Sequence, residues 1–155
     1  MPGLYYDQFH VGQLFKHPIR RTITEADNVW FSAVTHNPSY LHLDEEYCRN
    51  ETEFGQRLVN SCFTLALMVG VSVGDMVLGT AVANLGWDDV KLVAPVFAGD
   101  TIYAESEVLE VRPSKSRPGQ GLVRVRTRGF NQRDETVITY ERTVLVYERS
   151  SRPGA

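Results

Sequence analysis

The spacing of apolar and polar positions divides this chain into a largely helical first half and a strand-rich second half. Residues 59–73 read VNSCFTLALMVGVSV, so small or apolar side chains would occupy every side of a helix drawn through them. This pattern predicts a helix that is buried nearly all round and that Gly74 could end. After Gly79 the hydrophobic period becomes two, which predicts strands over residues 82–92, 101–112, 122–132 and 136–149.

A shorter helix is predicted from Thr24, which forms a capping box with Asp27 three residues on, Asp standing in for Glu. Phe31 and Val34 would share one side of this helix, and Pro38 would stop it. The first half should also contain a strand broken by Pro18, a short helix and a turn, over residues 15–24, 44–50 and 54–55.

A buried helix followed by a run of antiparallel strands predicts an α+β fold, with a curved sheet wrapped around a central helix as one domain over residues 1–149. Residues 113–121 would form a long loop and residues 131–134 a hairpin turn, while the polar residues 150–155 would fray. A sheet of this size leaves at least one edge unpaired. A homodimer or a dimer of dimers is therefore expected rather than a monomer.

The composition is ordinary for a globular protein and limits the classes open to it. The 155 residues suffice for one domain with a real core, and a net charge of −3 gives no support for a nucleic-acid partner. Neither an apolar run of transmembrane length nor a charged-then-apolar leader is present, so no membrane partner is expected. Cys48 and Cys62 are too few and too far apart for a metal site, and they indicate reduced thiols in a cytoplasmic protein.

The helix predicted from Thr24 ends in a polar loop that carries Asn37 and His42, five residues apart. Histidine is the side chain best suited to proton transfer near neutral pH, which makes His42 a candidate acid and base. Asn37 also fits a plain helix-terminating role. His10, His17 and His36 lie in no motif and are interpreted as surface residues.

Four stretches carry a recognisable pattern: YDQFHVG at 6–12, residues 24–44, FG followed by LVNS within 54–61, and VKLVAPVFAGDT at 90–101. Together they resemble the MaoC-like dehydratases, the (R)-specific enoyl-CoA hydratase group of hotdog-fold proteins, over residues 6–147. The resemblance implies a hotdog fold. It also implies a hydratase signature in which an Asp precedes a His by five residues and a second Asp follows that His by two.

This chain departs from the signature at one position. Aligning on His42 and Asp44 puts Asn37 where the family usually has its catalytic Asp. Aligning on Asn37-Pro38 instead puts Tyr40 at the His position and Thr35 at the Asp position, and loses both catalytic groups. We take the first register, since a subset of the family has Asn at the Asp position. That subset includes proteins resembling hydratases of mesaconyl- or itaconyl-CoA.

The resemblance implies a hydratase or dehydratase acting on an acyl-CoA thioester, with no cofactor beyond the coenzyme A of the substrate and no metal. Its site would consist of His42, Asn37 and Ser61. His42 would move protons, and Asn37, which cannot act as a base, would orient water through its amide. The backbone N–H groups of Ser61 and Cys62, at the start of the buried helix, are a candidate oxyanion hole, and capping is the other role for this stretch.

Two other functions stay open, a hotdog thioesterase and a non-catalytic acyl-binding protein. Residues 59–74 contain no Asp or Glu, which counts against the thioesterase. Lys115 and Arg117 could contact the phosphates of coenzyme A or belong to a solvated loop. Alternating charges predict a cross-strand ladder on the solvent side, rather than a ligand site, from residues Glu105, Glu107, Arg124, Arg126 and Arg128.

Overall fold

The computed structural model describes residues 3–152. Its helices are η1 (Tyr6–Gln8), α1 (Glu25–Val34), α2 (Tyr40–Leu43), α3 (Glu45–Glu51), α4 (Ser61–Met76) and η2 (Arg149–Ser151). Its strands are β1 (Leu14–Lys16), β2 (Arg21–Thr22), β3 (Ala81–Leu92), β4 (Thr101–Pro113), β5 (Gln120–Phe130) and β6 (Thr136–Tyr147). Within the described residues, no helix is both long and apolar enough to span a membrane.

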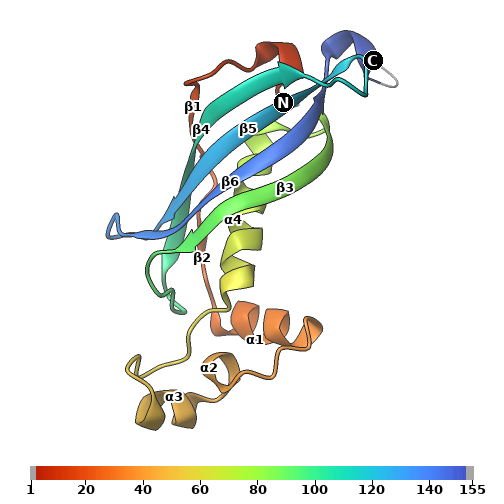
Figure 1. Cartoon of the computed structure of the whole chain (residues 1–155). Helices are drawn as coiled ribbons and strands as arrows, with labels where there is room; N and C mark the ends of the chain where they lie inside the picture. The colour runs from red at the N-terminus through yellow and green to blue at the C-terminus, as the bar shows by residue number, and fades with distance from the viewer. Residues whose placement is uncertain (1–2, 153–155) are drawn as a thin grey trace.

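The strands form one antiparallel sheet in the order β1-β4-β5-β6-β3, with β2 paired to β4 beside β1. The predicted N-terminal strand is thus present in two parts on either side of Pro18. Figure 1 shows the sheet curving along one side of α4, while α1, α2 and α3 form a lobe beyond the start of that helix. This is the α+β arrangement of the hotdog fold that the sequence predicts.

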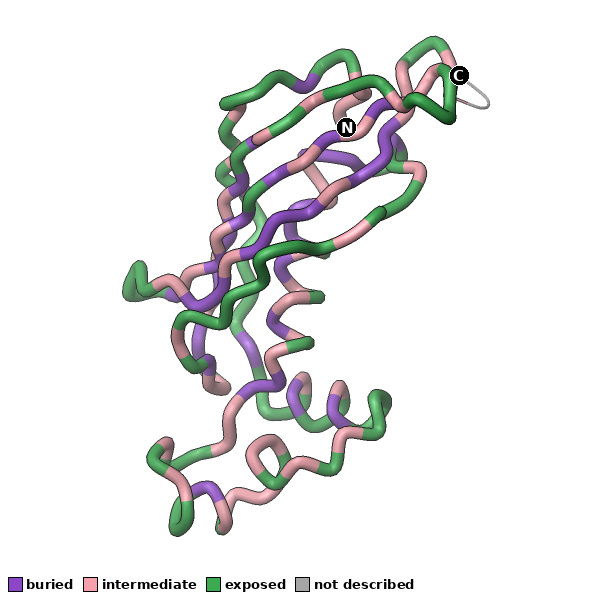
Figure 2. Tube along the Cα trace, viewed as in Figure 1, coloured by how far each residue is buried: buried purple, intermediate pink, exposed green. Residues whose placement is uncertain are grey.

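The core lies between α4 and the sheet. Residues spaced at helical intervals on one face of α4 are buried: Thr64, Met68, Val71, Ser72 and Met76. In β5, every second residue from Gly121 to Gly129 is buried and the residues between them are not, as a half-buried strand requires. Figure 2 shows burial concentrated on β5, β6 and the sheet-facing side of α4, with β3 largely exposed.

The opposite face of α4 is open, because Cys62, Ala66 and Gly70 are exposed. The expectation of burial nearly all round is therefore wrong for the single chain: apolar composition alone did not reveal which face the sheet covers. Gly74 does not end the helix either, since α4 continues to Met76.

The helix α1 starts as predicted, with Thr24 and Asp27 bonded reciprocally as a capping box. It ends at Val34, before Pro38, because His36 adopts a left-handed conformation (φ 54°). The backbone N–H groups of His36 and Asn37 then donate to the Ala33 and Ser32 carbonyls, which closes the helix in a Schellman motif. Phe31 and Val34 lie three residues apart in α1, on a side that is half-buried at Phe31 and exposed at Val34. The buried positions of α1 are polar, Asn28 and Ser32.

The C-terminal strands match their predicted ranges to within three residues. β5 ends at Phe130 because the Asn131 side chain accepts from the N–H groups of Arg133 and Glu135 and forms the hairpin turn. β6 ends at Tyr147. In the stretch expected to fray, residues 150–152 are described, and the Ser151 hydroxyl donates to the Glu148 carbonyl within the η2 turn. Residues 153–155 lie outside the described residues.

Candidate active site

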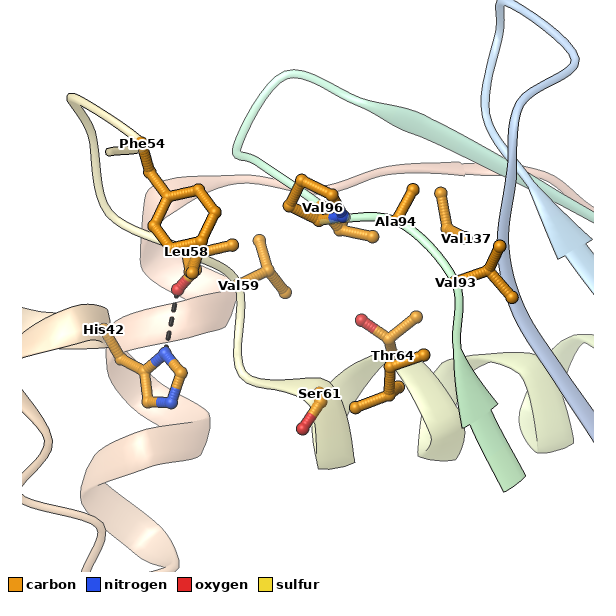
Figure 3. Close-up of a pocket in the computed structure, with 12 residues that line it drawn as sticks. His42, Phe54, Leu58, Val59, Ser61, Thr64, Val93, Ala94, Val96 and Val137 are labelled. Carbon is orange, nitrogen blue, oxygen red and sulfur yellow. Dashed lines mark hydrogen bonds between the residues drawn. The ribbon is translucent and has the colours of Figure 1, made fainter. Parts of the chain in front are cut away.

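A cavity of about 330 Å³ lies where α4 begins, between the lobe and the connection from β3 to β4 (Figure 3). Its size is within the usual range for a small-molecule site. The walls are mostly aliphatic, and the residues that line it are His42, Phe54, Leu58, Val59, Ser61, Thr64, Leu92, Val93, Ala94, Pro95, Val96 and Val137. His42 is the one ionisable side chain among them, so proton transfer inside this cavity would fall to His42.

The geometry of His42 fixes the state of its ring. Its Nδ1 lies 2.9 Å from the Leu58 carbonyl oxygen. A carbonyl oxygen can only accept, so Nδ1 carries a proton, and in the neutral ring Nε2 is left with a free lone pair. No group among residues 3–152 bonds to Nε2, and in Figure 3 this nitrogen lies on the side of the ring nearer Ser61. The ring is thus prepared to accept a proton at Nε2.

The start of α4 supplies a hydrogen-bond donor to the same cavity. Ser61 is the first residue of the helix and follows Asn60, whose side-chain oxygen accepts from the Cys62 N–H at 3.0 Å. The Cys62 amide is therefore used for capping, and its predicted share in an oxyanion hole is wrong. The Ser61 N–H has no partner among the described residues, and the positive end of the helix dipole lies there. Of the two backbone N–H groups predicted to form an oxyanion hole, only that of Ser61 is left.

Asn37 is not brought into this cavity within one chain. Its side-chain oxygen accepts from the Ser39 N–H at 3.0 Å, in the small turn that leads into α2. The residues that line the cavity include His42 and Ser61 but not Asn37. A carbonyl oxygen has two lone pairs, so either this oxygen or the NH2 group of Asn37 could contact a water molecule.

Asn28 was not singled out from the sequence, although it joins the parts of this site. Its side chain donates to the carbonyl oxygens of His42 and Leu58, and accepts from the Asn60 N–H. The sequence does contain a signal: Asn28 and Ser32 are four residues apart, so two polar side chains lie on the same side of α1. That side faces inward, which the sequence pattern did not reveal.

His17 is placed wrongly by the surface interpretation. Its side chain is buried against β4, with Nδ1 2.8 Å from the Asp75 carboxylate and Nε2 2.8 Å from the Ser106 hydroxyl. Ser106 in turn shares a hydrogen bond with Thr127 on β5. Asp75 belongs to the last turn of α4, so this network lies at the end of the helix opposite the cavity. His10 and His36 are exposed, as predicted.

A cross-strand charge ladder is present and also includes a residue of β6. Arg128 pairs with Glu105 on β4, whereas Arg124 and Arg126 both pair with Glu141 on β6. Lys115 and Arg117 are exposed and line a separate cavity of about 310 Å³ beside Ala83 and Leu85, at the start of β3. The cavity that holds His42 is at the other end of β3, so within one chain the two lie apart. Among residues 3–152, no cluster of His, Cys, Asp and Glu is arranged to hold a metal ion.

Comparisons with known proteins identify the family of this chain. Residues 8–129 match the family described as MaoC like domain, and the chain belongs to this family. It is 32% identical over 153 residues to a mesaconyl-CoA hydratase of Cereibacter sphaeroides, covering 99% of this chain and 44% of the relative. It is also 32% identical to a β-methylmalyl-CoA dehydratase of Chloroflexus aurantiacus, covering 99% and 43%.

Among solved structures, the chain is similar to an unliganded R-hydratase of Pseudomonas aeruginosa, with a TM-score of 0.79 and 29% identity. The match covers 95% of this chain and 88% of that one. The chain spans less than half the length of the hydratase and dehydratase relatives named above. The family and the fold are thus established, while the activity is a matter for proposal.

Proposed function

We propose that this chain adds water to, or removes water from, the 2,3-double bond of an enoyl-CoA thioester. The observation that carries the proposal is one cavity lined by both His42 and Ser61, whose Nε2 and backbone N–H have no partner among residues 3–152. Hydration needs a proton acceptor for water and a donor for the charge that develops on the thioester oxygen. These two groups supply one of each.

The reaction would use the two groups as follows. Nε2 of His42 takes a proton from a water molecule as its oxygen bonds to the β-carbon. The electrons of the double bond move toward the thioester carbonyl, whose oxygen accepts a hydrogen bond from the Ser61 N–H. Nε2 of His42 then gives the proton it took from water to the α-carbon, so the sum is addition of one water and the ring returns to its neutral state. Dehydration is the same path in reverse.

Asn37 is assigned the role of orienting water through its side-chain amide. Its place five residues before His42, where the family usually has Asp, supports this role. Its position outside the residues that line the cavity limits what it can do. Its contribution should therefore be smaller than that of His42.

The acyl group is proposed to be branched or carboxylated, of the mesaconyl- or itaconyl-CoA kind. The names of the two relatives support this choice. The aliphatic walls fit the branch, while no Lys or Arg lines the cavity within one chain to pair with a carboxylate. A thioesterase is less well supported, because no Asp or Glu lines the cavity and Asp75 is held by His17.

A second copy of the chain is the proposed partner, in a homodimer or a dimer of dimers. β3 is a sheet edge with exposed apolar side chains at Leu85, Trp87, Val90 and Leu92. Next to it, Trp87 and the open face of α4 form a shallow apolar hollow. Two such edges could pair and cover both surfaces. The unpaired Cys48 and Cys62 support a reducing compartment, and we propose the cytoplasm.

A panel of enoyl-CoA thioesters, including crotonyl-, mesaconyl- and itaconyl-CoA, tests the activity. Loss of the enoyl absorbance without release of thiol is the expected result. Release of free thiol would favour a thioesterase, and binding with neither signal would favour an acyl-binding protein. Light scattering on the same sample should give twice the chain mass, and a monomer at working concentration would contradict the dimer.

A further inference from the structure

Asn28 is a polar residue buried within α1, a position that destabilises the folded protein unless the side chain is hydrogen-bonded. It is 1% exposed. Asn is a weak helix former, and a buried amide is destabilising unless its groups are bonded. Here both the NH2 group and the carbonyl oxygen of the side chain have partners. Because its amide is fully hydrogen-bonded, Asn28 holds the segments around it in place.

The orientation of the Asn28 amide follows from its partners. The His42 and Leu58 carbonyl oxygens, at 3.2 and 3.0 Å, can only accept, so the NH2 group faces them. The Asn60 N–H, at 2.8 Å, can only donate, so the side-chain oxygen faces it. One amide therefore joins α1 to the end of α2 and to two positions of the loop before α4, the second of which is the residue that caps α4.

Two of these bonds act on His42. The Leu58 carbonyl oxygen accepts from Nδ1 of His42 and from Nδ2 of Asn28. A carbonyl has two lone pairs, so it can serve both donors at once. Asn28 thereby holds the oxygen that fixes the tautomer and the direction of the His42 ring. It also holds the backbone of His42 itself.

The third bond acts on the donor side of the site. Asn28 holds the Asn60 N–H, and the next N–H along the chain is the unbonded one of Ser61. The same side chain thus sets the distance between the proton acceptor and the candidate oxyanion donor, although it does not line the cavity.

We propose that Asn28 is a positioning residue for the hydration reaction, acting on His42 through the shared Leu58 carbonyl and on Ser61 through Asn60. This rests on the proposed function. Shifts of about 1 Å in reacting groups can cost roughly a hundredfold in rate. Removing Asn28 should therefore lower kcat rather than weaken substrate binding.

The test is Asn28→Ala, compared with the wild type for kcat, KM and the ¹⁵N spectrum of the His42 ring at alkaline pH. Expected are a kcat lower by roughly ten- to a hundredfold, a KM changed by about twofold or less, and a His42 ring that loses its single Nδ1–H tautomer. If Asn28→Ala does not fold, Asn28→Asp has the same shape and keeps the acceptor for Asn60. Asn28→Asp lacks the NH2 group that donates to the His42 and Leu58 carbonyl oxygens, so we expect the same loss of kcat and of the single tautomer.

Ser32→Ala is the matched control. Ser32 is fully buried, lies one turn further along α1 and touches the Asn60 side chain at 3.4 Å, without a bond to His42 or Leu58. Its kcat and its His42 tautomer should stay close to those of the wild type.

Equal losses in Ser32→Ala and Asn28→Ala would show a general loosening of α1 and overturn the proposal. A folded Asn28→Ala protein with wild-type kcat and an unchanged tautomer would overturn it as well. If the wild type hydrates no enoyl-CoA, the proposed function fails. The tautomer comparison then still decides whether Asn28 holds the ring.

Discussion

The two ends of α4 each have a histidine beside them, and the two histidines are bonded in opposite ways. Near the end of the helix, His17 is buried and both ring nitrogens are bonded to side chains, those of Asp75 and Ser106. Near its start, Nδ1 of His42 is bonded to a backbone carbonyl, while Nε2 has no partner in the described part of the chain and the residue lines a cavity. A histidine can move protons for a substrate only if a ring nitrogen is free and accessible.

The comparison assigns the two histidines to different tasks. His17 connects β1, β4 and α4, so its removal should lower the free energy of unfolding. His42 has a fixed tautomer and a free ring nitrogen, so its removal should lower kcat. The predictions below test this division from the largest expected effect to the smallest.

The largest effect should come from His42→Ala. Loss of the proton carrier should lower kcat by roughly a hundred- to ten-thousandfold, with the melting temperature nearly unchanged. Hydration of the accepted enoyl-CoA, followed by absorbance, measures it. His10→Ala is the control, because His10 is exposed, and it should keep the wild-type rate. A His42→Ala protein that hydrates the substrate at the wild-type rate would show that His42 is not the proton carrier.

Ser61→Pro should give the next largest effect. Ser61 is the first residue of α4, where proline is well tolerated, and Asn60 before it has the extended conformation that proline demands (φ −58°, ψ 124°). The fold should survive while the N–H is lost, and kcat should fall by roughly a hundredfold or more. Ser61→Ala retains the N–H and should lose little. A large loss in the alanine variant, with folding intact, would assign the role to the hydroxyl.

Features that depend on neighbouring residues in the sequence were predicted better than features that depend on contacts between distant residues. The helix α4 and the four long strands follow from local periodicity, and so do Thr24 as a cap and the Asn131 turn. His42 and Ser61 were found through a resemblance carried by short motifs, and the structure brings both to one cavity.

The failures involve contacts between distant residues. The partners of His17 are 58 and 89 positions away, so no local pattern marks it as buried. The polar inner side of α1 depends on Asn60, 32 positions from Asn28. Cys62 is the exception, because its N–H is bonded by the side chain of Asn60, only two positions before it.

His17→Ala should change stability rather than chemistry. It leaves the Asp75 carboxylate and the Ser106 hydroxyl without their partner and opens a small cavity, which together should cost about 3 kcal/mol. Denaturant unfolding measures this, with His10→Ala expected within roughly 0.5 kcal/mol of the wild type. The rate per folded molecule should stay near that of the wild type. A folded His17→Ala protein that had lost its activity would break the division between the two ends of α4.

Asn37 should give the smallest effect. Asn37→Ala should lower kcat by roughly tenfold or less, because the side chain does not line the cavity within one chain. Asn37→Asp should leave a working hydratase with altered preference among the enoyl-CoA panel. Steady-state kinetics of both variants measure this. An Asn37→Ala loss as large as that of His42→Ala would mean that Asn37 shares the central chemistry.

The most direct test of the account is a ¹⁵N spectrum of the histidine rings in the wild-type protein, recorded at alkaline pH with and without a saturated acyl-CoA that cannot react. We predict that His42 has its proton on Nδ1, and that its free Nε2 changes shift when the acyl-CoA binds, while both nitrogens of His17 stay unchanged. A proton on Nε2 of His42, or a response confined to His17, would contradict the claim that the chemistry lies at the start of α4.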